Sequence, residues 1–306
     1  MLFKDAVVAY QKNYSGKDAS QESRLAFWVE QLGNYEVQAI TALDIDDSIG
    51  VLMQRPAQTC IRKKIGQNEA GEVIYEVRYR DLDRPKSEAT LNRYIAALGS
   101  VFRFIKKMRL IRGFISPISG VEKFKESQGR LEFMTEGEVE LLIAKARSSR
   151  WKKLACLIRI AFVTGVRSGA LKAMRWKHIN WELKTITFPI TKNGEPHTAP
   201  LNEACIEELL RIFSDRCGME DLVFCGKFRS KAHDFRSSYM TLIHDLFPGR
   251  DLNFHSLRHS CCSHLAKKGV PLPVIAAWMT HKSLRMVSRY SHISTADREN
   301  YLRSAF

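Results

Sequence analysis

The chain lacks the features of a secreted or membrane-spanning protein. Its seven cysteines are an odd number, form no Cys-x-x-Cys pair and include the adjacent Cys261 and Cys262, which argues against a disulfide framework. The start of the chain, Met1-Leu-Phe-Lys-Asp, has no signal-peptide pattern. The most apolar run, Leu154–Val166, is too short to span a membrane and contains Arg159. We therefore expect a soluble, cytoplasmic protein.

Acidic residues are in short supply. The 306 residues include 48 Lys and Arg but only 33 Asp and Glu, which gives a formal net charge of +15. The imbalance is larger in the second half, because residues 127–306 carry 28 basic against 17 acidic side chains and residues 1–126 carry 20 against 16. Such a charge is typical of proteins that bind nucleic acid, although a basic protein with no anionic partner has the same composition.

The length and the hydrophobic content of 45% are sufficient for a core and two domains. A polar stretch at 116–130, rich in Ser, Lys and Gly, marks the boundary between them. We predict a first domain over 1–120, a linker over 121–130 and a second domain over 131–306.

Two segments of the mostly helical first domain carry candidate DNA contacts. Residues 61–80 read as two strands around a Gly-containing turn, which predicts a β-hairpin, either a solvated one or a clamp on the DNA backbone. Residues 88–108 repeat apolar side chains at three- and four-residue spacing, which predicts a helix with one buried face. The candidate DNA-binding residues of these segments are Arg62, Lys63, Lys64, Arg78, Arg93, Arg103, Lys106 and Lys107.

The second domain mixes helices with a few strands. Thr135 and Glu138 have the spacing of a capping box, and Trp151–Val163 reads as a buried helix. Residues 184–201 predict two strands around an Asn193-Gly194 turn, and the pattern after Ala204 is mainly helical. The expected fold class is mainly α (α+β), with a small antiparallel sheet.

The second domain also contains the parts needed to break and rejoin a phosphodiester. A guanidinium can donate two parallel hydrogen bonds to phosphate oxygens, and a lysine at a turn can protonate a leaving 5′ oxygen. A tyrosine with an ordinary pKa near ~10 needs a nearby base and a positive field to act as a nucleophile. The candidate catalytic residues are Arg167 in Thr164-Gly-Val-Arg167, Lys192, His255 and Arg258 in His255-Ser-Leu-Arg258-His259, His281 and Tyr290.

These motifs, in this order and spacing, resemble the tyrosine recombinases of the phage-integrase type. The resemblance covers about residues 131–295, and the preceding helical segment resembles the family's core-binding domain. It implies the tyrosine-recombinase fold, with a mixed α/β catalytic domain. By the same resemblance Arg167 and Arg258 clamp the scissile phosphate, and Tyr290 attacks it to form a 3′-phosphotyrosyl link. Lys192 then acts as general acid, His255 as base or positioning residue, and His281 as a hydrogen-bond donor.

The resemblance also implies a reaction and an assembly. The reaction is site-specific exchange of double-stranded DNA for integration or excision of a phage or mobile element, in a bacterial cell or phage-infected host. Neither a metal nor another cofactor is implied. The assembly is a tetramer on DNA, in which the chain after Tyr290 packs on a neighbouring subunit, with room for an accessory DNA-bending or directionality protein.

Two positions depart from the family pattern. Ala170 stands where a carboxylate usually follows the first arginine, and Thr280 stands where glycine often precedes the later histidine. An ordinary backbone angle at Thr280 would make that change harmless.

Three alternatives to a recombinase remain at this stage. A type IB topoisomerase-like enzyme uses similar catalytic residues, and a non-catalytic DNA-binding relative would account for Ala170. A general basic scaffold protein is the third, and it leaves the ordered motifs unexplained. A metal site is a separate possibility, but the spacing of the candidate ligands matches no standard zinc pattern: His259, Cys261, Cys262 and His264.

Overall fold

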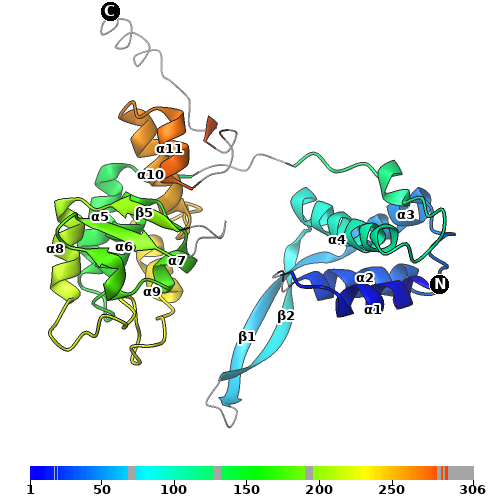
Figure 1. Cartoon of the computed structure of the whole chain (residues 1–306), viewed down its shortest axis with the longest axis horizontal. Coiled ribbons are helices and arrows are strands. Elements are labelled where there is room, and N and C mark those ends of the chain that lie inside the picture. Colours follow the sequence, from blue (N-terminus) through cyan, green and yellow to red (C-terminus); the bar gives the residue numbers. More distant parts are fainter. Residues whose placement is uncertain are drawn as a thin grey trace, which may run out of the picture. The chain divides into compact units, whose positions relative to one another are not determined.

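The computed structural model describes residues 1–16, 18, 20–67, 73–126, 132–189, 196–280, 284, 287 and 288. The chain divides into two compact units, Met1–Gly129 and Arg130–Phe306, called unit 1 and unit 2 below (Figure 1). Each unit has its own core of buried apolar side chains. Within the described residues no helix is long and apolar enough to cross a membrane.

Four helices build the core of unit 1. They are α1 (Phe3–Lys12), α2 (Gln21–Leu32), α3 (Ala42–Gln54) and α4 (Glu88–Lys107), followed by a short 3-10 helix at Pro117–Gly120. Helix α4 buries the apolar face that its periodicity predicts, and Trp28 of α2 donates its indole N–H to the Tyr94 carbonyl at 2.9 Å. Thr41 and Asp44 form a capping box that starts α3.

A long antiparallel ribbon connects α3 to α4. Its strands are β1 (Pro56–Gln67) and β2 (Val73–Pro85), so it extends beyond the predicted 61–80 at both ends. Cys60 pairs with Tyr79, and the register shifts between Lys64 and Gly66. Figure 1 shows the ribbon extending away from the helices of unit 1. A two-stranded ribbon has no second layer to cover it, which is why Ile61, Ile65 and Ile74 are exposed.

Unit 2 is organised around one buried helix. Helix α6 (Leu154–Thr164) buries every residue except Val163, and α5 (Glu136–Ala146), α8 (Glu203–Ile212) and α10 (Ser256–Lys267) pack against it. Its one charged residue, Arg159, is paired with Glu140 of α5, which explains a charge inside an apolar run. The capping box predicted at Thr135 and Glu138 is confirmed at the start of α5.

The remaining elements of unit 2 are short. They are α7 (Ser168–Lys172), a 3-10 helix at Trp176–His178, α9 (Arg236–Leu246) and α11 (Leu272–Trp278). The sheet has the order β3-β4-β5 and is antiparallel, with β3 (Ile179–Asn180), β4 (Thr185–Phe188) and β5 (His197–Pro200). The prediction for 184–201 located β4 and β5 but missed β3, because two residues are too few to show an alternating pattern. The Asn193-Gly194 turn lies outside the described residues.

Candidate active site

The end of α6 places the first catalytic motif. Gly165 caps the helix in the left-handed conformation, with φ of +61°. A Cβ at this position would lie 2.6 Å from the sulfur and from the terminal carbon of Met279, and 3.3 Å from Cys261 Sγ. Glycine is therefore required twice over, by the backbone angle and by the close packing of the side chains around it.

Arg167 is the N-cap residue of α7. Its backbone is extended, with φ of −72° and ψ of 149°, and its carbonyl accepts the Ala170 N–H at 3.0 Å. The side chain is partly exposed. The Thr-Gly-Val-Arg motif therefore presents Arg167 at the start of a helix.

Arg258 lies on the first turn of α10 and is almost completely buried, with 5% of its surface exposed. Its guanidinium donates to the Gly165 carbonyl at 2.5 Å and also to the Met279 carbonyl. Gly165 ends α6 and Met279 follows the last residue of α11. Arg258 therefore ties together the two chain segments that lead to Arg167 and to His281. We call this pair of hydrogen bonds the Arg258 joint. The sequence predicted Arg258 as a phosphate ligand and gave no indication of these two hydrogen bonds.

A second hydrogen bond strengthens the same joint. The Trp278 indole N–H donates to the Val163 carbonyl at 3.0 Å, so α11 is attached to α6 two residues before Gly165. The thiol of Cys261 contacts the same carbonyl at 3.6 Å, and burial raises its pKa well above the usual thiol range. The cysteines of α10 thus pack in the core beneath the site. Among the described residues no group of three or more His, Cys, Asp or Glu side chains could hold a metal ion.

His255 immediately precedes α10 and is held by Asn253. The backbone N–H of His255 donates to Asn253 Oδ1 at 2.8 Å, and the Asn253 N–H donates to Ser256 Oγ at 3.1 Å. Sequence reasoning missed Asn253, although an Asn whose side chain bonds the backbone two residues on is a recognisable turn residue. The histidine keeps exposed surface. Partial desolvation and the positive charges of Arg258 and Arg167 lower its pKa below the usual 6.5.

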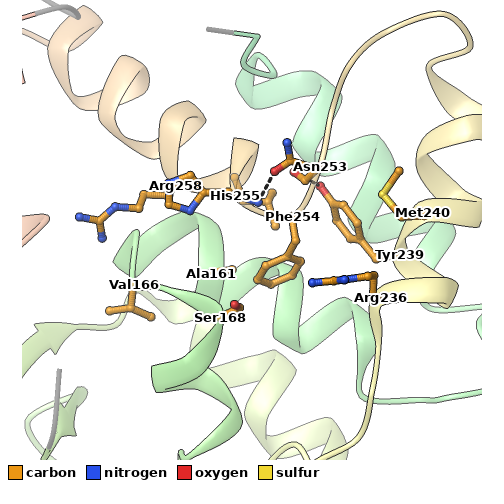
Figure 2. A pocket seen from close by; sticks show the side chains of 11 residues that line it. Ala161, Val166, Ser168, Arg236, Tyr239, Met240, Asn253, Phe254, His255 and Arg258 are labelled. Atoms are coloured by element: carbon orange, nitrogen blue, oxygen red, sulfur yellow. Dashed lines mark hydrogen bonds between the residues drawn. The ribbon is translucent and has the colours of Figure 1, made fainter. Parts of the chain in front are cut away.

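His255 and Arg258 open onto one cavity of about 350 Å³. Figure 2 shows its lining, to which the α6–α7 segment contributes Val166 and Ser168 and α9 contributes Arg236. In the same view the Arg258 guanidinium lies on the Val166 side, away from Phe254. The cavity therefore collects a histidine and two arginines. Arg236 was not among the predicted site residues, because no sequence motif connects the start of α9 to the start of α10.

Sequence reasoning also missed a histidine of the sheet. His197 begins β5, pairs with Phe188 in the register and stacks on its ring at 6.4 Å between centroids. Its Nε2 is buried, and no hydrogen-bond partner for it exists among the described residues. Burial and the charge of Arg258 lower the pKa of His197, so the imidazole is held neutral beside the buried arginine.

Both departures from the family pattern have structural consequences. Thr280 adopts φ of +51°, in the left-handed region. Its backbone angle is therefore not an ordinary one, and threonine in place of glycine is not harmless there. A β-branched residue in this conformation stores about 1 kcal/mol or more of strain just before His281. Ala170 lines a separate hollow with Phe188 and Leu222, and no carboxylate is among the residues that line it.

Three of the predicted catalytic residues, Lys192, His281 and Tyr290, lie outside the described residues. Of the other three, the structure brings His255 and Arg258 to one cavity, and Arg167 is close enough for its charge to act on His255.

The basic residues predicted on α4 are all exposed: Arg93, Arg103, Lys106 and Lys107. Arg93, Arg103 and Lys107 lie at spacings of ten and four residues, which places them on one face of the helix. Arg78 of the ribbon is exposed and forms an ion pair with Glu76 at 2.8 Å. Arg62, Lys63 and Lys64 lie in β1, but their side chains are outside the described set.

Comparisons with known proteins agree with this architecture. The chain is 27% identical over 218 residues to the integrase of Haemophilus phage HP1, covering 71% of this chain and 60% of the relative. It is 29% identical to the shufflon-specific DNA recombinase of Escherichia coli, covering 69% and 52%. The chain thus spans little more than half the length of these curated relatives.

Solved structures share the fold at lower sequence identity. The Tn1549 transposon integrase in complex with transposon right end DNA superposes with a TM-score of 0.72 at 16% identity, over the full length of both chains. A lambda integrase dimer bound to a COC′ core site gives 0.69 at 18% identity, over 97% and 96% of the two chains. The sequence profile of the phage integrase family matches residues 132–297, more than half of the chain. The chain therefore belongs to the phage integrase family.

Proposed function

We propose that the protein is a site-specific DNA recombinase that cleaves and rejoins DNA through a 3′-phosphotyrosyl intermediate. The observation that carries the proposal is the Arg258 joint, in which one buried guanidinium ties the Arg167 loop to the segment before His281. Such a joint fixes the relative positions of groups that must act on one phosphate at the same time.

The proposed reaction needs no external source of energy. The phenolic oxygen of Tyr290 attacks the scissile phosphorus, the bond from phosphorus to the 5′ oxygen breaks, and Lys192 protonates the leaving oxygen. A 5′-hydroxyl of the partner strand then attacks the phosphotyrosine, which restores the phosphodiester and releases the tyrosine. The energy of the broken bond is kept in the covalent intermediate.

The remaining residues stabilise charge in the transition state. Arg167 and Arg258 neutralise the negative charge that develops on the non-bridging oxygens, and His281 adds a hydrogen bond there. The lowered pKa of His255 keeps its imidazole neutral near pH 7, the form that can accept a proton from Tyr290.

In this proposal unit 1 binds double-stranded DNA without regard to its sequence. The exposed face of α4 with Arg93, Arg103 and Lys107 suits a row of phosphates. The ribbon suits the major groove, which is wide enough to admit a two-stranded β-ribbon. Exposed Arg78 and Tyr79 would meet the DNA from β2, and Arg62, Lys63 and Lys64 of β1 are placed on the same ribbon.

We infer that the biological role is movement of a phage or other mobile element, with a tetramer as the active assembly. The similarity to a phage integrase, a shufflon recombinase and a transposon integrase supports this role. An accessory DNA-bending or directionality protein is compatible with it.

A plasmid assay tests the proposal against the topoisomerase alternative. The substrate carries two copies of the junction sequence from the element that encodes the chain, and a matched plasmid carries none. We expect inversion or deletion between the two copies and no relaxation of the matched supercoiled plasmid. Relaxation of both plasmids without rearrangement would favour the topoisomerase. Binding of the junction without cleavage would favour the non-catalytic relative.

A further inference from the structure

A basic, aromatic loop precedes α9. Residues Gly226 to Lys231, called the 226–231 loop below, read Gly-Lys-Phe-Arg-Ser-Lys. Lys227, Phe228, Arg229 and Lys231 are all exposed, and 64% of the Phe228 surface is accessible. In Figure 1 the chain between α8 and α9 protrudes from the lower end of unit 2. An exposed aromatic ring among cations on a protruding loop is a combination typical of nucleic-acid contacts.

The loop has a defined conformation. The Gly226 N–H donates to the Lys231 carbonyl, and the Lys231 N–H donates to the Phe228 carbonyl, both at 3.1 Å. Cys225 and Ala232 form an isolated antiparallel bridge at the base. The loop therefore closes as a tight hairpin that presents its side chains to solvent.

The base of the loop is fixed to the core of unit 2. The Trp151 indole stacks on His233 at 4.4 Å between centroids and donates its N–H to the Cys225 carbonyl at 3.1 Å. The Lys153 ammonium donates to the Val223 carbonyl at 2.7 Å. These contacts involve residues at least 70 positions apart and hold both arms of the loop. Because the loop is preorganised, binding a ligand costs little conformational entropy.

The chain after the loop leads directly to the candidate active site. Lys172 of α7 lies 5.2 Å from the centre of the Phe235 ring, so the start of α9 packs against the helix that follows Arg167. The next residue, Arg236, lines the cavity with His255 and Ser168 (Figure 2). Arg236 is five positions after Lys231, a reach of at most ~17 Å. Along the DNA helix axis that distance corresponds to about five base pairs, since each strand carries one phosphate per ~3.4 Å of axis.

The charge of this segment suits the DNA backbone. Residues 226–236 contain four cations, Lys227, Arg229, Lys231 and Arg236, against one carboxylate, Asp234. Arg229 is paired with Asp221 at 3.0 Å, which leaves the two lysines as the more available charges. Lys172 approaches Asp234 at 4.0 Å and partly compensates the one negative charge.

We propose that the 226–231 loop binds the phosphates of duplex DNA next to the cavity, within about five base pairs of the phosphate that Arg236 contacts. Lys227 and Lys231 contact phosphates, and Phe228 packs against the deoxyribose of the same strand. Arg236 continues this row of contacts into the cavity. The inference rests on the proposed function, because the site of cleavage sets where the loop meets the DNA.

The test uses the double variant Lys227→Gln/Lys231→Gln of the full chain. Affinity for a 40-base-pair duplex of arbitrary sequence is measured between low and moderate salt. Log K falls as log salt rises, with a slope of about −0.9 for each phosphate contact, so we expect the slope of the variant to be less steep by ~1.8. The control variant Lys145→Gln/Arg150→Gln removes two exposed charges elsewhere in unit 2 and should leave the slope unchanged. Phe228→Ala should weaken binding severalfold without a change of slope.

The outcomes separate this inference from the proposed function. An unchanged slope in Lys227→Gln/Lys231→Gln, with wild-type melting temperature, would overturn the loop contact. Equal loss of slope in the control variant would do the same, because it would show a general effect of charge. Failure of the wild-type protein to form a covalent DNA adduct would instead contradict the proposed function, and the slope measurement would still report on the loop.

Discussion

Replacing Arg258 by lysine is expected to lower the rate of covalent adduct formation by about 10³-fold. A guanidinium can donate to the carbonyls of Gly165 and Met279 and still direct N–H groups toward a phosphate, because its five donors are spread around a planar fork. A lysine ammonium is a single point that cannot reach both carbonyls in the same geometry. The variant should therefore lose the joint between the two catalytic segments as well as a phosphate contact. The measurement is the single-turnover rate on a nicked duplex.

Arg250→Lys is the matched control for this prediction. Arg250 is also a multiply bonded arginine of unit 2, since it donates to Glu138 at 2.6 Å and to the Phe133 carbonyl at 2.8 Å. It is not among the residues that line the cavity. We expect its substitution to lower the melting temperature but to leave the rate of the folded protein within about twofold of wild type. A folded Arg258→Lys protein with a near wild-type rate would contradict both roles of Arg258, as the connection between the two segments and as a phosphate ligand.

Replacing Gly165 by alanine is expected to destabilise unit 2 by about 3 kcal/mol. The left-handed φ of +61° costs roughly 1 kcal/mol for a residue with a Cβ. The overlap with the end of the Met279 side chain, which is fully buried, adds about 1–3 kcal/mol. The displaced carbonyl would also disturb its hydrogen bond with Arg258. Chemical denaturation of the wild-type protein and the variant measures the free energy of unfolding.

Two further variants divide that cost into its parts. Gly137 lies in α5 with open space where a Cβ would be, so Gly137→Ala should be neutral or stabilising by up to ~1 kcal/mol. In a Met279→Ala background the overlap is removed, and Gly165→Ala should then cost only the ~1 kcal/mol of the backbone term. An equal cost in both backgrounds would show that Met279 does not restrict this position.

The sequence predicted the catalytic residues of the site better than it predicted the contacts that hold them in place. Arg167, His255 and Arg258 were predicted from ordered motifs, and the structure brings His255 and Arg258 to one cavity beside the Arg167 loop. The capping box of α5 and the buried face of α4 follow from local spacing, which depends on few neighbours. These features are local, or belong to a family pattern.

Features that depend on contacts between distant segments could not be predicted. The hydrogen bond from Arg258 to Gly165 joins residues 93 positions apart, and nothing in either motif indicates it. Arg236 lines the cavity because the start of α9 lies beside α7 and Tyr239 of α9 packs on Phe254, just before α10. The buried Nε2 of His197 depends on the pairing of β5 with β4. The left-handed conformation of Thr280 contradicts its local preference, so the surrounding structure must impose it.

The most direct test of the central claim is covalent trapping with Tyr290→Phe as the comparison. Nicked duplexes tiled across the DNA that flanks the gene supply the substrate, and the nick releases the 5′ fragment so that rejoining cannot occur. The account predicts a protein–DNA adduct through a 3′ phosphate with the wild-type chain and none with Tyr290→Phe, which should still bind the same duplex. An adduct that persists in Tyr290→Phe would contradict the assignment of the nucleophile. Absence of an adduct on a tightly bound junction would contradict the recombinase itself.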